Sequence, residues 1–144
     1  MLIMKLSKNF TLEELIYSST ANAKGIRNYP SPMEIENLRR LCVEVLQPIR
    51  DKYGKPIYIN SGYRNPALNR AVKGSQTSQH LTGSAADVDV ANNRELWDVI
   101  VSLIRSGRIT VGQLIWEKGN NIAPDWIHIS LPTQFKKNQI LKLK

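Results

Sequence analysis

Apolar residues recur at helical spacing in two long stretches of the chain, which predicts two amphipathic helices. The first covers about 32–52, and its apolar positions are Ile35, Leu38, Leu41, Cys42, Val45, Leu46 and Ile49. A capping box at Ser31–Glu34, with proline at the first helical position, should begin this helix; Pro48 should kink it and Gly54 should end it. The second helix covers 92–106, where apolar residues again share one face.

Shorter signals predict two small helices and the loops between them. Thr11–Glu14 is another capping box, so a short helix should run from there to about Tyr17, and 65–72 is a further short helix. The polar stretches 18–30 and 73–83 contain glycine together with small polar residues, and they are expected to be loops.

Four short apolar runs predict strands. They cover 55–61, 85–90, 111–116 and 126–130, whereas the basic tail 132–144 has little pattern. Helices and strands are mixed along the chain without strict alternation, which favours an α+β fold. We therefore expect residues 1–144 to form a single domain in which helices pack on a small, mostly antiparallel sheet.

Composition narrows the class of protein. The chain has 144 residues, the length of one ordinary domain, and its single cysteine, Cys42, excludes a disulfide framework and a cysteine-rich zinc module. No apolar run approaches the length of a membrane span, and the first ten residues, MLIMKLSKNF, lack the features of a signal peptide. We expect synthesis in the cytoplasm, unless another system exports the protein or lyses the cell.

The charge of the chain favours an anionic partner. Twenty Lys and Arg residues against twelve Asp and Glu give a formal net charge of +8. Nucleic acid is the simplest candidate, and anionic cell-wall polymers would be attracted by the same field. The basic residues are scattered, however, and no zinc finger, helix-turn-helix or RNA-recognition signature accompanies them, so charge alone does not identify the partner.

The only two histidines of the chain mark its candidate chemistry. His80 begins the pattern H-x-x-G-x-A-x-D, and His128 ends the pattern D-x-x-H. Two histidines and one carboxylate can hold a zinc ion and leave the fourth position for water, while a further carboxylate takes up the proton. Spacing alone does not decide between Asp87 and Asp89 as the ligand, and histidines with ordinary polar partners are the alternative interpretation.

The same segments carry a resemblance to a known family. The chain resembles the M15 family of zinc peptidases in four places. These are Ser61-Gly62-Tyr63-Arg64, Asn69, the stretch 78–87 and the stretch 125–129. That family includes D-alanyl-D-alanine carboxypeptidases, D,D-dipeptidases and phage L-alanyl-D-glutamate endolysins. The resemblance covers roughly 57–130 and is closest to the short single-domain members found in phages and prophages. It implies the fold shared by D,D-peptidases and hedgehog-type proteins.

The resemblance also implies a role for each matching residue. One zinc ion per chain would be held by His80, Asp87 and His128. Asp125 would be the general base, at a position that many relatives fill with glutamate. Arg64 would bind the developing oxyanion or a substrate carboxyl group, for which its planar fork is suited. Ser78 would donate or accept a hydrogen bond to the substrate.

These roles predict a zinc metallopeptidase that cleaves the stem peptide of peptidoglycan at the cell wall, after release or lysis. We also expect the protein to be a monomer. The sequence leaves open whether the bond is D-Ala-D-Ala, L-Ala-D-Glu or a crossbridge bond. A non-catalytic, zinc-bearing binding module of the same fold is the first alternative, against which the presence of both Asp125 and Arg64 argues. A basic nucleic-acid binder is the second, and it leaves the two histidine motifs unexplained.

The sequence also indicates the environment of five further residues. Cys42 and Trp97 lie on apolar helix faces and are expected in the core. Trp126 should pack beside the site or line its cleft, and Tyr63 fits substrate contact and aromatic packing equally well. Glu117 ends a predicted strand, where a solvated charge is the simpler interpretation and a cleft-lining carboxylate is the alternative.

Overall fold

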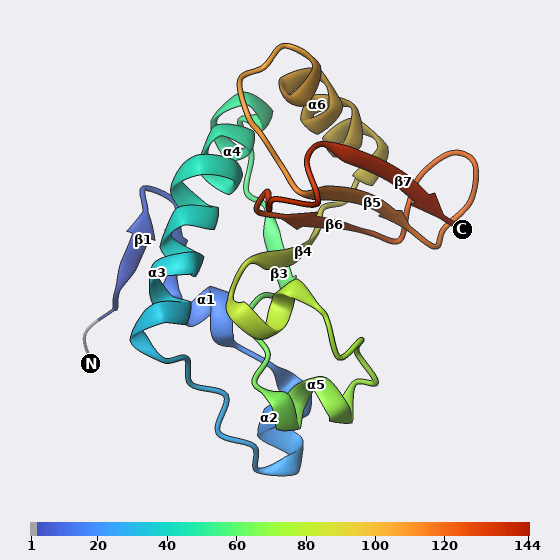
Figure 1. The fold of residues 1–144 in the computed structure, drawn as a ribbon. Helices are drawn as coiled ribbons and strands as arrows, with labels where there is room; N and C mark the ends of the chain where they lie inside the picture. The colour runs from blue at the N-terminus through green and yellow to red at the C-terminus, as the bar shows by residue number, and fades with distance from the viewer. Residues whose placement is uncertain (1–2) are drawn as a thin grey trace.

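One five-stranded sheet crosses the molecule in the computed structural model, which describes residues 3–144 (Figure 1). Its strands stand in the order β3-β4-β6-β5-β7. They are β3 (Tyr58–Ser61), β4 (Ala85–Asp89), β5 (Gln113–Glu117), β6 (Trp126–Ser130) and β7 (Gln139–Leu143). Three of the four pairings are antiparallel and only β5 and β7 run parallel, so the predicted α+β fold with a mostly antiparallel sheet is confirmed.

The edge strand β7 corrects the prediction of a patternless tail. Each residue from Gln139 to Leu143 has a partner on β5, and the Lys118 amide donates to the Leu143 carbonyl at 2.7 Å. All five residues of β7 are nevertheless exposed. Hydrophobic periodicity reports burial, and an exposed edge strand that is held by backbone hydrogen bonds gives no such signal.

The long helical segment predicted at 32–52 is present in three parts. α3 (Pro32–Leu41) continues through a π-helical segment, η1 (Cys42–Leu46), into α4 (Gln47–Tyr53). The capping box forms as expected, with the Glu34 amide donating to Ser31 Oγ. Pro48 lies in the first turn of α4, and the irregular backbone is the π-helical segment before it, where the Gln47 amide donates to the carbonyl five residues earlier.

The remaining helices and a short hairpin complete the fold. The short helix α1 (Leu12–Ile16) and α5 (Pro66–Ala71) match the predictions, as does α6 (Asn93–Arg105). The stretch 18–30 is not only loop, because α2 (Ser19–Lys24) forms within it. Its residues are mostly polar, so the sequence has no apolar periodicity there, and Ser18 caps the helix. The hairpin β1 (Lys5–Ser7) and β2 (Phe10–Thr11) and the 3₁₀ helix η2 (Gln79–Thr82) were not predicted.

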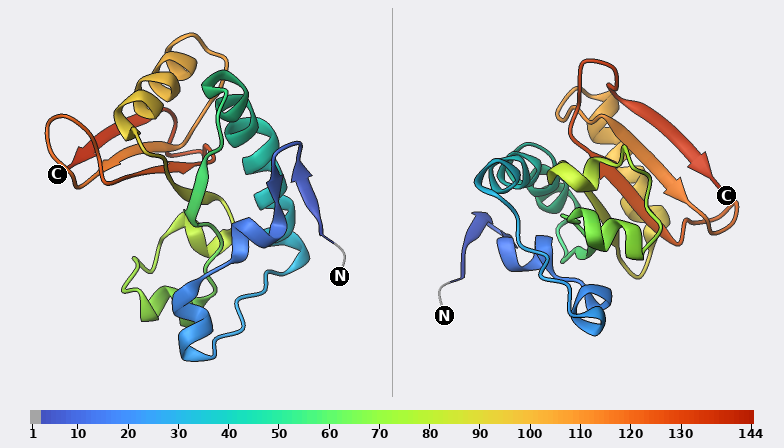
Figure 2. Two further views of the ribbon diagram at one scale, coloured as in Figure 1. Left: turned by 180° about the vertical axis from the view of Figure 1, so that it is seen from behind. Right: turned by 60° about the horizontal axis from the view of Figure 1, so that its bottom comes forward.

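Helices cover only part of the sheet, and this positions the site. Figures 1 and 2 show α6 along one side of β5 and β6. Trp97 on α6 and Trp116 on β5 meet edge to face, with ring centroids 5.3 Å apart. Trp97 and Cys42 belong to the buried core, as predicted. Within residues 3–144 no helix combines the length and the apolar character that crossing a membrane requires.

Candidate metal centre

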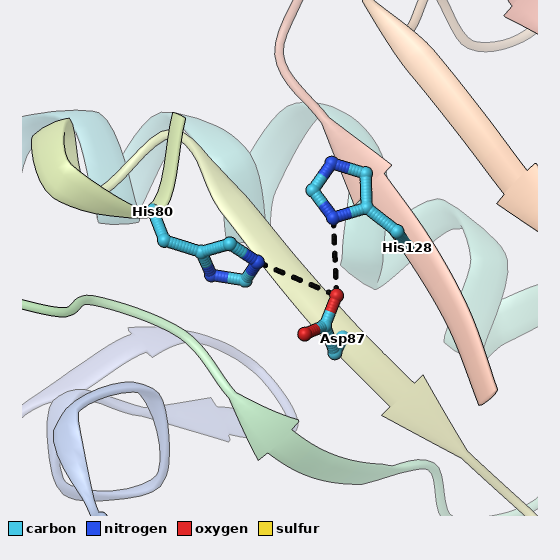
Figure 3. A group of neighbouring side chains, drawn as sticks. All are labelled: His80, Asp87 and His128. Atoms are coloured by element: carbon cyan, nitrogen blue, oxygen red, sulfur yellow. Dashed lines mark hydrogen bonds and ion pairs between the residues drawn. The ribbon is translucent and has the colours of Figure 1, made fainter. Parts of the chain in front are cut away.

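His80, Asp87 and His128 come together from three different elements (Figure 3). His80 lies on η2, Asp87 on β4 and His128 on β6, and one ligand atom from each lies within 4.8 Å of the others. Asp87 Oδ1 is 3.0 Å from His128 Nδ1 and 3.4 Å from His80 Nε2. Two imidazole nitrogens and one carboxylate oxygen around a single point are the donor set of a catalytic zinc site with one position left open.

The backbone around η2 fixes the His80 ring. Ser78 caps this 3₁₀ helix, and its Oγ accepts a hydrogen bond from the His80 amide at 3.1 Å. The buried ring places Nδ1 2.7 Å from the Gly62 carbonyl oxygen. Since a carbonyl oxygen only accepts, Nδ1 donates this hydrogen bond, and Nε2 is the ring nitrogen that faces Asp87. A carbonyl that orients a histidine in this way is typical of metal ligands.

Gly62 and Gly83 allow two segments of the site to pack closely against helices. A Cβ atom on Gly62 would lie 2.2 Å from the Leu15 carbonyl oxygen, so the chain passes too close to α1 for a side chain. Gly83 has φ +72°, and a Cβ atom there would lie 2.7 Å from the Glu34 carbonyl oxygen on α3. Both positions therefore allow the motif loops to approach the helices closely, which holds His80 in place.

The electrostatics of Asp87 favour its ionised form. Burial alone would raise its pKa, but hydrogen bonds from His128 and His80 together outweigh burial and hold the pKa well below its usual range. Asp89, the other candidate from the sequence, accepts a hydrogen bond from Asn93 Nδ2 at 2.7 Å and takes no part in the cluster. The structure thus places Asp87, and not Asp89, beside the two histidines.

An open cavity of about 490 Å³ contains this cluster, and two more predicted residues line it. Arg64 Nη2 lies 3.5 Å from Ser78 Oγ, and Arg64 Nε is buried without a hydrogen-bond partner among the described residues. Burial lowers the pKa of Arg64, and the charge of Asp87 opposes that effect. A guanidinium with an unused donor beside the ligand cluster is suited to bind an oxyanion or a carboxylate.

Asp125 is the predicted residue that the structure does not bring into the cavity. Its side chain is exposed, and the residue is absent from the cavity lining. Its backbone is engaged instead: the Asp125 amide donates to the Glu117 carbonyl at 2.9 Å, and Asn93 Nδ2 donates to the Asp125 carbonyl at 3.0 Å. Asp125 thus lies immediately before β6, and its side chain is not among those that line the cavity around the cluster.

Glu117 is the carboxylate that lines the cavity besides Asp87. Burial raises its pKa, and the negative charge of Asp87 raises it further. The sequence favoured a solvated charge at this position. The two-residue alternation along β5 could have indicated the cavity, because Ile115 and Glu117 share a face and both are lining residues.

Of the two aromatic residues that the sequence left undecided, one lines the cavity and the other lies in the core. Trp126 lines the cavity, whereas Tyr63 is buried outside it, and burial raises the pKa of its phenol to about 12. Lys73 and Lys136 also line the cavity; the sequence indicated Lys136 only as part of the basic tail and gave no role to Lys73. Lys136 belongs to the tail, whose return to the sheet as β7 brings it there.

Comparison with models of protein families identifies a family for this chain. The model of a peptidase family described as Peptidase M15 matches residues 8–130, which is most of the chain and includes every residue of the cluster and both motif segments. No curated protein matches the sequence.

Proposed function

Because the chain belongs to the M15 peptidase family, we propose that it is a zinc-dependent peptidase that hydrolyses a peptide bond in the stem peptide of peptidoglycan. The observation that carries this proposal is the His80–Asp87–His128 cluster inside an open cavity. A buried metal-binding triad with no route to a substrate would suit a structural site, whereas this one faces the space that a peptide can enter.

The donor atoms available in the cluster fit a zinc ion. His80 would contribute Nε2, because its Nδ1 is taken by Gly62, and His128 would contribute Nδ1, the nitrogen that faces Asp87. Asp87 would contribute a carboxylate oxygen. A zinc ion supplies Lewis acidity toward a carbonyl group and toward water.

Other residues of the cavity would bind the peptide and its developing charge. Arg64 would donate its unused Nε–H, or its Nη groups, to the oxyanion or to a substrate carboxylate. Ser78 would keep the His80 segment in place through the bond to the His80 amide and would offer its hydroxyl to the substrate. Hydrolysis further requires a carboxylate that accepts the proton of the attacking water.

The charge of the protein supports an anionic substrate. The chain carries a formal net charge of +8, and Arg64, Lys73 and Lys136 all line the cavity. Stem peptides bear free carboxylates, and the wall polymers around them are frequently anionic, so the same field would concentrate the protein at its substrate. The enzyme would act at the cell wall, after release from the cytoplasm or after lysis.

The experiment is mass spectrometry of soluble muropeptides after incubation with zinc-loaded protein. The proposal expects pairs of products whose masses sum to that of the parent plus one water, and the position of the cut identifies the bond. His128→Ala serves as the control without a complete ligand set. If the wild-type protein holds zinc and leaves every muropeptide intact, the protein is a zinc-bearing binding module of this fold and not a peptidase acting on stem peptides.

A further inference from the structure

We infer that Lys136, in the turn before β7, binds an internal carboxylate of the substrate, on the side of the metal-ligand cluster away from Arg64. An internal carboxylate is one that a peptide carries besides its C-terminal group. The inference rests on the proposed function, which supplies the substrate class. It adds that the preferred substrate is a stem peptide whose internal carboxyl groups are free and not amidated.

Two hydrogen bonds close the turn that carries Lys136. The Lys136 amide donates to Thr133 Oγ1 at 3.0 Å, and the Thr133 amide donates to the Lys136 carbonyl at 2.9 Å. Three residues later β7 begins, and Gln113 Nε2 on β5 donates to Gln139 Oε1 on β7 at 3.1 Å. Gln113 also lines the cavity, so the turn and the strand together hold Lys136 beside the Gln113 end of β5.

The ammonium group of Lys136 has no hydrogen-bond or ion-pair partner within residues 3–144, although the residue is partly buried in the cavity wall. Two other lysines of the tail are engaged: Lys142 Nζ lies 4.4 Å from the centroid of the Trp116 ring, and Lys144 Nζ donates to an asparagine side chain. Lys137, the next residue, is exposed and lies outside the cavity lining. Lys136 is therefore the tail cation that is placed to meet a ligand, and a charge-assisted hydrogen bond to a carboxylate is the strongest contact open to it.

The acidic residues of the cavity do not occupy Lys136. Asp87 Oδ1 faces the two histidines, at 3.0 and 3.4 Å. Glu117, the other acidic residue of the lining, ends β5, four residues along the strand from Gln113. Since a strand rises by ~3.3 Å per residue, these two positions of β5 are about 13 Å apart. An anion for Lys136 has to come from the ligand.

Lys136 and Arg64 reach the cavity from opposite edges of the sheet. Arg64 follows β3 and Lys136 precedes β7, and these two are the edge strands (Figure 1). Asp87 and His128 lie on β4 and β6, between the two edges. A peptide bound across the cluster therefore has a guanidinium on one side and an ammonium on the other. Because Arg64 serves the oxyanion or a C-terminal carboxylate, the second cation serves a second carboxylate, which is an internal one.

The segment that carries Lys136 lies outside the family match, which ends at residue 130. The turn and β7 thus stand outside the part of the chain that defines the family, yet they contribute a residue to the cavity that holds the cluster. Loops and additions around a common scaffold are where proteins of one fold differ in what they bind. The cluster accounts for the chemistry, and Lys136 accounts for a preference among substrates.

The test uses one stem peptide in two synthetic forms, with its internal carboxyl groups either all free or all amidated and its C-terminal carboxylate kept in both. Zinc-loaded wild type, Lys136→Met and Lys137→Met are compared on both forms by kcat, KM and the dissociation constant. Methionine keeps an unbranched apolar side chain and removes the charge. Lys137→Met is the matched control, because it changes the net charge equally at a tail residue outside the cavity.

The wild type should have a kcat/KM about tenfold higher on the free form than on the amidated form, the effect of one hydrogen bond between charged groups. In Lys136→Met, kcat/KM on the free form should fall about tenfold, through KM, and kcat/KM on the amidated form should not change. Lys137→Met should match the wild type on both forms. Zinc content should be equal in all three proteins, because neither lysine is a ligand.

The outcomes separate this inference from the proposed function. In Lys136→Met, an equal loss on both forms or no loss at all overturns the inference and leaves the proposed function intact. The same loss of preference in Lys137→Met also overturns it, because net charge would then account for the effect. A wild-type protein that holds zinc and cleaves neither form overturns the proposed function. The dissociation constants then decide the inference by themselves: tighter binding of the free form that Lys136→Met abolishes supports it, and equal binding of both forms overturns it.

Discussion

Asp87 and His128 face each other directly across β4 and β6, and Asp87 Oδ1 lies 3.0 Å from His128 Nδ1. Their proximity is therefore a property of strand register and needs no flexible loop. A slip of one residue between these strands would move one of the two side chains to the opposite face of the sheet. The apolar residues that alternate with them, such as Val88 and Ile127, are buried in the core and oppose such a slip.

The first prediction concerns the identity of the metal ligands. Asp87→Asn and His128→Ala should each weaken zinc binding by more than about 100-fold, since even residues that only support a ligand account for 10–100-fold. Asp89→Asn is the matched control on the same strand, and it should bind zinc like the wild type because Asp89 pairs with Asn93. Zinc competition titrations provide the measurement, and weakened binding in the Asp89 variant alone would exchange the two assignments.

The second prediction concerns the acid stability of the metal-free protein. The pKa of Asp87 is lowered in the folded state, so its ionised form stabilises the fold at pH values above the unfolded-state pKa of about 3.9. This contribution should diminish as pH falls below that value, toward the lower folded-state pKa. Denaturant titrations of wild type and Asp87→Asn between pH 7 and pH 3 should show a difference in unfolding free energy that shrinks with acidification. A difference that grows instead would mean that the pKa is raised.

The third prediction concerns the close approach of Gly62 to α1. Gly62→Ala should destabilise the protein by about 1–3 kcal/mol, because the added methyl group meets the Leu15 carbonyl and the backbone has to shift. The same shift moves the carbonyl that orients His80, so zinc affinity should fall as well. Gly107→Ala is the control: it places a residue at φ +75° but meets no atom within 4 Å. Thermal denaturation with and without zinc measures both effects. Equal zinc affinity in the two variants would show that the close approach at Gly62 does not position His80.

The fourth prediction concerns the geometry of the Arg64 side chain. Arg64→Lys keeps the positive charge and loses the planar fork, so kcat/KM on a muropeptide should fall by about 10–100-fold, the value of one or two charge-assisted hydrogen bonds. Zinc content should not change, because Arg64 is no ligand. Steady-state kinetics alongside metal analysis provide the measurement, and a variant with wild-type kinetics would show that charge alone suffices.

The fifth prediction concerns attraction to the wall. At a net charge of +8, the protein should cosediment with purified anionic cell walls and should dissociate as the screening length falls from about 10 Å at 0.1 M salt to about 3 Å at 1 M. Binding that does not depend on salt would indicate specific recognition. Tight, saturable binding to DNA at 0.15 M salt would instead support the nucleic-acid alternative.

The sequence predicted those parts of the fold that bury a regular pattern of apolar residues or begin with a capping box. The capping boxes at Thr11 and Ser31 both form, and the four apolar runs are four of the five strands of the main sheet. The helix α2 and the strand β7 were missed because they bury little: α2 buries only Ala21, and β7 buries nothing. Their stability comes from caps and edge hydrogen bonds, to which periodicity is insensitive.

The residues of the candidate site could be predicted where they lie together in one short sequence motif. The two histidine motifs identified the cluster, but Asp87 and Asp89 lie on the same face of one strand. They are separated by the register with β6, which sets Asp87 opposite His128, and by the hydrogen bond from Asn93 to Asp89. Glu117 shows the limit more clearly. Its nearness to His128 depends on the register between β5 and β6, and register is a relationship between two segments that neither segment contains by itself.

One face of the central strands packs in the core and the other carries the candidate metal ligands, so folding should not depend on metal binding. Ala86, Val88 and Ile129 point into the core and are almost wholly buried, whereas the alternate residues Asp87 and His128 point into the cavity. Small zinc domains that fold only when the metal binds have no comparable core. Chelation should therefore leave this protein folded, with the near-ultraviolet circular dichroism of Trp97 and Trp116 intact, and the active enzyme should be recovered by adding zinc without any refolding step.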